Sequence, residues 1–254
     1  MFKSELRDSW YCGRHFFVAH VVWPGMILVA MLLLAENSRL DVLVAESWYR
    51  LEGGQWAWRD SWYANNLIHF YGKRMLFAFG LVLIALLFLG RFSARLRRWR
   101  KTLAYVLACL AVLPALVALL KYFSQVPCPW DLVRFGGEQP YEHTASYALG
   151  HTDTGNCFPA GHASGGFALL SIYFASLGHA RRPFVWLLPG LLVGWIFALG
   201  QQSRGAHFLS HDLWTLSICW FGALLIFLWI RPDRAAVAPH ESGLSGTKFE
   251  GRYS

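Results

Sequence analysis

Charged residues are scarce in this chain of 254 residues, where Asp, Glu, Lys and Arg together make up 15%. A soluble domain carries roughly a quarter, so this scarcity excludes an ordinary soluble domain, and the 56% hydrophobic content excludes a disordered chain. The five cysteines are too few for a disulfide scaffold, and no C-x-x-C pair suggests a zinc ribbon or a thioredoxin-type site. Acidic residues are outnumbered 15 to 23 by basic ones, and in so apolar a chain the net charge of +8 indicates contact with anionic lipid.

Charge is absent altogether from six stretches. At about 1.5 Å per residue, a helix of about 20 residues reaches roughly 30 Å, the thickness of a bilayer core. Two stretches are shorter, and flanking basic residues can extend them by snorkelling. A soluble protein with six such buried helices would have too little polar chain to cover them. We therefore predict an all-α fold, an integral membrane bundle of six transmembrane helices over residues 16–35, 75–90, 102–120, 163–178, 183–200 and 213–230.

The basic residues are distributed unevenly around these stretches. They gather before the first, between the second and third, between the fourth and fifth, and after the sixth. Because short positive loops stay in the cytoplasm, we expect both termini to be cytoplasmic, in a bacterial inner membrane. Residues 1–234 would form one domain, followed by a disordered cytoplasmic tail over 235–254. The loops 36–74, rich in Trp and Tyr, and 121–162 would then face outward, the first lying at the headgroups.

Several charged and titratable residues fall on the outer face by the parity of the predicted spans. Such groups close to a bilayer are candidates for function. Their chemistry suits a phosphate, because Lys and Arg bind its oxygens, one imidazole attacks or accepts a proton, and another donates one. The start of the fourth helix adds backbone N–H donors for the same anion. The candidates are Lys121, Gly161, His162, Arg204, His207, His211 and Asp212.

Three stretches carry a resemblance to a known family: KYFSQVPCP at 121–129, PAGH at 159–162 and SRGAHFLSHD at 203–212. In order, spacing and position relative to the spans, they resemble the motifs K-x6-R-P, P-S-G-H and S-R-x5-H-x3-D of the type 2 phosphatidic acid phosphatase family. Members are six-span membrane enzymes related to vanadium haloperoxidases. The resemblance covers roughly residues 75–230.

The resemblance implies roles for the residues that match. His207 would be the nucleophile that forms a phosphohistidine, His162 the acid that protonates the leaving group, and Lys121 a phosphate ligand. It implies no metal and no organic cofactor. His143, His151 and Asp153 match no standard ligand spacing, so the sequence predicts no metal site there.

Other positions depart from the family motifs. Cys128 stands where the first motif has Arg, and Arg134 is a candidate replacement; Ala160 removes the Ser hydroxyl of the second motif. Gln201 stands where the third-motif Arg usually lies, and Arg204 could reach the phosphate instead. Either His211 or Asp212 could orient the His207 ring, and the sequence leaves both open.

A disulfide between Cys128 and Cys157 is a further hypothesis. Both lie in the predicted outer loop beside the first two motifs, and an oxidising periplasm would permit the bond. It would close a loop of about 30 residues and hold the motif segments together.

These observations predict a membrane lipid phosphatase with its active site on the periplasmic side. Phosphatidic acid, phosphatidylglycerol phosphate, undecaprenyl diphosphate and lipid A phosphate all fit as substrates. The expected partners are this lipid and the bilayer, without nucleic acid, and the oligomeric state stays open. The alternatives are a lipid-to-lipid phosphotransferase and a non-catalytic lipid-binding protein on a decayed phosphatase scaffold.

Overall fold

A computed structural model describes residues 13–62, 70–141 and 155–232 as helices joined by turns and short loops, without a β-strand in this part of the chain. The chain is therefore all-α over the described ranges, as the uncharged stretches predict. The predicted tail over residues 235–254 lies outside the described residues, as do His143, His151 and Asp153.

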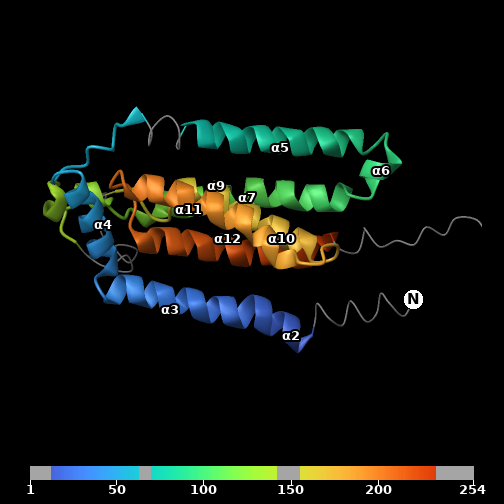
Figure 1. Ribbon diagram of the computed structural model, residues 1–254, viewed down its shortest axis with the longest axis horizontal. Helices are drawn as coiled ribbons and strands as arrows, with labels where there is room; N and C mark the ends of the chain where they lie inside the picture. The colour runs from blue at the N-terminus through green and yellow to red at the C-terminus, as the bar shows by residue number, and fades with distance from the viewer. Residues whose placement is uncertain (1–12, 63–69, 142–154, 233–254) are drawn as a thin grey trace, which may run out of the picture.

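Five helical segments among the described residues are long and apolar enough to cross a membrane. Figure 1 shows the main helices of these segments running side by side along the long axis of the molecule. The five are Arg14–Asn37, built from α2 (Arg14–Phe17), a π-helical turn (Val18–Val22) and α3 (Trp23–Asn37); α5 (Gly72–Leu89); Arg100–Asp131, which contains α7 (Arg100–Ser124); Pro183–Gln202, which contains α11 (Leu188–Gln202); and α12 (Leu209–Ile230).

The remaining predicted span, residues 163–178, corresponds to a shorter helical run inside the bundle. It consists of α9 (Gly161–Phe167), a 3-10 turn (Ala168–Leu170) and α10 (Ser171–Ser176). At about 1.5 Å per residue it extends about 24 Å, less than the roughly 30 Å of a bilayer core. Phe167, Leu170 and Phe174 are fully buried. The described residues thus contain five helices of spanning length, and a sixth span remains a prediction.

The α9 helix packs very closely against α11. A side chain at Gly166 would place its first carbon 2.5 Å from the Cα of Gly194, and one at Gly194 would meet the Phe167 ring at 2.1 Å. Small residues at such a crossing let two helix backbones approach each other directly. The end of α9 and the middle of α11 are therefore in direct contact, which fixes the relative position of the two helices.

A short helix, α4 (Leu40–Leu51), lies across one end of the bundle, at the opposite end from α6 (Ala94–Arg97) (Figure 1). The buried Asp41 in α4 accepts a hydrogen bond from the backbone N–H of Ser210 at 2.8 Å, in the first turn of α12. An apolar cluster joins the same regions through Ala45, Tyr49, Trp56, Leu132, Phe135 and Phe208. Part of the loop predicted to lie at the headgroups therefore packs on the segment that carries His207.

Candidate active site

The three motif segments meet at the end of the bundle that α4 covers. Backbone hydrogen bonds tie each segment to another, since Trp130 donates to Gly205 (3.0 Å), Cys157 to Val126 (2.9 Å) and Ala160 to His211 (3.4 Å). The structure also joins Cys128 to Cys157 through a disulfide, with the two Cα atoms 5.2 Å apart. Because Cys128 follows the first motif lysine and Cys157 precedes the second motif, the bond links these two segments covalently.

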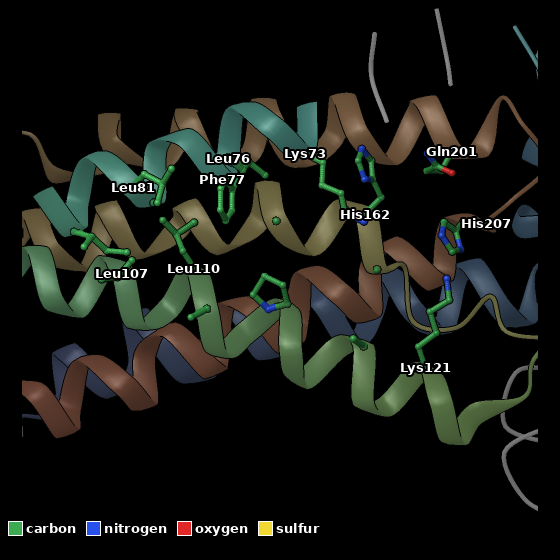
Figure 2. A pocket seen from close by; sticks show the side chains of 17 residues that line it. Lys73, Leu76, Phe77, Leu81, Leu107, Leu110, Lys121, His162, Gln201 and His207 are labelled. Carbon is green, nitrogen blue, oxygen red and sulfur yellow. The ribbon is translucent and has the colours of Figure 1, made fainter. Parts of the chain in front are cut away.

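A cavity of about 630 Å³ lies between α5, α7 and α9. Five polar side chains line one end of it, and Figure 2 shows them gathered there from α5, α7, α9, α11 and the turn between α11 and α12. No carboxylate of the described residues lines the cavity. An excess of cationic and neutral nitrogen groups without a carboxylate suits an anion. The polar residues are Lys73, Lys121, His162, Gln201 and His207.

The other end of the same cavity is apolar. It is lined by Leu76, Phe77, Leu81 and Ile84 of α5 and by Leu107, Leu110 and neighbouring residues of α7. From Lys121 to Leu107, α7 covers about 21 Å at about 1.5 Å per residue, somewhat more than the roughly 15 Å of one bilayer leaflet. Phe77 is 70% exposed, so the groove is open at the surface of the bundle.

His207 is buried at the polar end, in the turn between α11 and α12. The turn requires glycine at position 205. Its φ of 69° is one that other residues rarely adopt, and a side chain there would meet Trp56 at 2.5 Å. Burial lowers the pKa of His207 well below its usual value, and the charges of Lys121, His211 and His162 lower it further, against the opposing effect of the Cys157 carbonyl. A lowered pKa favours the neutral ring near pH 7, and a neutral imidazole has one nitrogen with a free lone pair.

His162, Lys121 and Gly161 lie at the same polar end as His207. The His162 ring packs against Phe197 of α11, with 4.5 Å between the ring centroids. The lysine stem passes over Gly161, since a side chain there would lie 3.8 Å from the Cδ of Lys121. The structure thus brings four of the sequence-predicted residues into one cavity.

Arg204 and Arg134 do not line this cavity. Arg204 donates from Nε to the carbonyl of Arg59 at 2.9 Å and from its guanidinium to Gln201 at 3.4 Å. Arg134 forms an ion pair with Glu46 of α4 at 3.2 Å. In this structure both predicted replacements for the family arginines contact other parts of the protein.

His211 and Asp212 are both fully buried, but they face different neighbours. The His211 and His207 ring centroids are 5.9 Å apart, and neither ring nitrogen of His211 is hydrogen-bonded within the described residues. Asp212 accepts a hydrogen bond from Gln202 at 2.8 Å. The His211 ring thus contacts the His207 ring, whereas the hydrogen bond of Asp212 is to Gln202.

Two residues of this region were not singled out by the sequence. Lys73 precedes an apolar stretch, and the sequence assigns it only a snorkelling role. Asp41 lies about 170 residues from its partner Ser210, and nothing in the local sequence indicates the contact. Parity of the spans places Lys73 on the outer face, but it does not give the rotation of α5 toward the cavity.

Comparison with known families decides the relationship that the motifs suggest. The PAP2 superfamily model matches the chain over residues 102–235. The chain belongs to the PAP2 superfamily. No curated protein and no solved structure matches it significantly. The PAP2 match includes all three motif segments and excludes α4 and α5. Together with the apolar helices, PAP2 membership makes the chain a membrane protein of the phosphatase type.

Proposed function

We propose that this PAP2 protein is a lipid phosphatase that removes phosphate from a lipid phosphate or diphosphate. One observation carries the proposal: His162 and His207 lie at the cationic end of a cavity whose other end is an open apolar groove. A phosphate ester of a lipid has the same two parts. Its headgroup would lie by Lys121 and the histidines, and its chain would extend along α5 and α7.

The proposed reaction proceeds through two displacements. A ring nitrogen of neutral His207 attacks phosphorus, the P–O bond to the lipid breaks, and His162 donates a proton to the departing oxygen. Water then attacks the phosphohistidine while His162 accepts its proton, which releases inorganic phosphate and restores His207. Lys121 and the backbone N–H groups at Gly161 would balance the charge on the phosphate oxygens. His211 would position the His207 ring.

The orientation in the membrane is part of the same proposal. The site lies at the α4 end, whereas α6 and the other short basic loops belong to the opposite end, which would be cytoplasmic. The disulfide between Cys128 and Cys157 lies beside the site and suits an oxidising compartment. Both features support a periplasmic site in a bacterial inner membrane. The lipid would then enter the groove sideways from the outer leaflet.

Phosphate release from defined lipids tests the function. Purified protein in detergent with EDTA would be given phosphatidic acid, phosphatidylglycerol phosphate, undecaprenyl diphosphate and lipid A phosphate. We expect release by the wild type and by His15→Ala, an exposed histidine at the far end of the bundle, but loss of about 10³-fold or more in His207→Ala.

The products separate the alternatives. Transfer of labelled phosphate to a second lipid, without inorganic phosphate, would replace hydrolysis by phosphotransfer. Binding of these lipids without any turnover would favour a non-catalytic scaffold. Equal release by wild type and His207→Ala would contradict the assigned nucleophile.

A further inference from the structure

Two lysines approach the polar end of the cavity from opposite walls. Lys121 comes from the end of α7 and Lys73 from the first turn of α5 (Figure 2). Both ammonium groups belong to the lining of the same cavity, where two like charges repel each other. No carboxylate among the described lining residues offsets this repulsion, and the Lys73 ammonium makes no ion pair within the described ranges. An anion bound between the two ammonium groups would be attracted by both of them and would offset their mutual repulsion.

Neither the position of the first-motif arginine nor the two candidate replacement arginines supplies a second cation to the cavity. Cys128, at the position of the first-motif arginine, is in the disulfide with Cys157. Arg134 is paired with Glu46, and Arg204 contacts Arg59 and Gln201. Lys121 alone would leave much of the charge of a phosphate dianion unbalanced.

The packing of α5 places Lys73 at this position. Gly72 is buried against the ring of Phe197, where an added side chain would come within 2.6 Å. The same Phe197 ring packs on His162. One turn further, Leu76 lies where a side chain at Gly165 of α9 would project, 2.7 Å away. The first turn of α5 therefore sits directly against the helices that carry His162 and Gln201.

We infer that Lys73 is a phosphate-binding residue that supplies the second cation of this site. This inference rests on the proposed function only for the identity of the substrate. It assigns to α5 a part of the active site that lies outside the PAP2 match. The α5 side of the groove would then contact both the lipid chain and its phosphate.

Binding of inorganic phosphate to the full chain in detergent tests the inference independently of turnover. Isothermal titration would compare wild type with Lys73→Met, Lys73→Arg and Arg74→Met. Arg74 is the matched control, because it is adjacent and cationic but lies over the Phe70 ring, 3.9 Å from its centroid, and does not line the cavity.

We expect Lys73→Met to weaken phosphate binding about 10-fold or more, with most of the affinity restored in Lys73→Arg and Arg74→Met close to wild type. With a lipid substrate, kcat/KM should fall by a similar factor. Unchanged affinity in Lys73→Met, equal losses in the Lys73 and Arg74 variants, or no phosphate binding by the wild type would each overturn the inference. Phosphate binding by the wild type without lipid turnover would instead overturn the proposed function and leave Lys73 to be judged by affinity alone.

Discussion

In the proposed mechanism, His207 attacks phosphorus only while its ring is neutral. Its pKa is held well below the usual value of about 6.5 by burial and then by nearby positive charge, including that of Lys121. The neutral form therefore persists as the pH falls through 6.5, and we expect kcat/KM to decline only at a distinctly lower pH. Lys121→Met removes one of the charges that lower this pKa, so its acid limb should move to higher pH.

The measurement is kcat/KM against pH for both proteins, with Lys101→Met at the opposite end of the bundle as control. The maximum kcat/KM will fall in Lys121→Met if the lysine binds phosphate. The midpoint of the acid limb depends on the ionisation of His207 and is read separately from that maximum. An acid limb that stays in place or moves to lower pH in Lys121→Met would contradict the electrostatic coupling between Lys121 and His207.

At the residue scale the sequence predicted the core of the site but not its edges. His162, His207 and Lys121 were predicted from motif context, and the structure brings them into one cavity. Arg134 does not line the cavity and pairs instead with Glu46, which is 88 residues away in the chain. Tertiary packing brings these two residues together, so spacing along the sequence could not reveal the contact.

Among the helices, α4 makes the contact with the site that is hardest to predict. The Asp41 carboxylate accepts the Ser210 N–H in the first turn of α12, three residues after His207. Removing an acceptor at a helix N-terminus costs about 1 kcal/mol, and more when the freed N–H is buried. We expect Asp41→Ala to lower the free energy of unfolding by about 1–2 kcal/mol and to reduce kcat.

Asp41→Asn keeps an acceptor oxygen and should retain most of both quantities. Denaturant unfolding in detergent, together with phosphate release, measures them. Glu46→Gln is a suitable control, because the ion pairs of this α4 carboxylate among the described residues are with the exposed Arg50 and Arg134. If Asp41→Ala and Glu46→Gln behaved alike, Asp41 would have no special role in holding α12.

Five of the six predicted spans correspond to helices of spanning length, because an uncharged apolar run favours a helix inside the bilayer. The exception, residues 163–178, is equally apolar for a different reason. Phe167, Leu170 and Phe174 are surrounded by other helices, so their apolar character reflects packing inside the protein. Composition cannot distinguish a side chain facing lipid from one facing a neighbouring helix.

At the scale of the whole molecule, the open groove predicts a dependence on substrate chain length. Gly80 of α5 lines the groove, and a side chain there would meet no atom within 4 Å. Gly80→Leu should therefore fill the groove without disturbing the helix. We expect kcat/KM for long-chain lipid phosphates to fall about 10-fold or more, with little change for a short water-soluble phosphate monoester.

Initial rates with both substrates give the comparison, and Val82→Phe serves as control, since Val82 is exposed on α5 but does not line the groove. Equal losses for the two substrates would show that Gly80→Leu damages the site itself. No loss for either would show that the lipid chain lies elsewhere.

The glycine contact between α9 and α11 has a consequence for how such a protein can change over generations. Gly166 and Gly194 hold α9, which carries His162, directly against α11, whereas α5 has only Gly72 and Leu83 buried. Under the proposed function, substitutions on α5 beyond its first turn, which holds Gly72 and Lys73, would alter which lipids are accepted while the reacting groups keep their geometry. Natural selection or protein engineering could then change the range of lipid substrates through substitutions in α5.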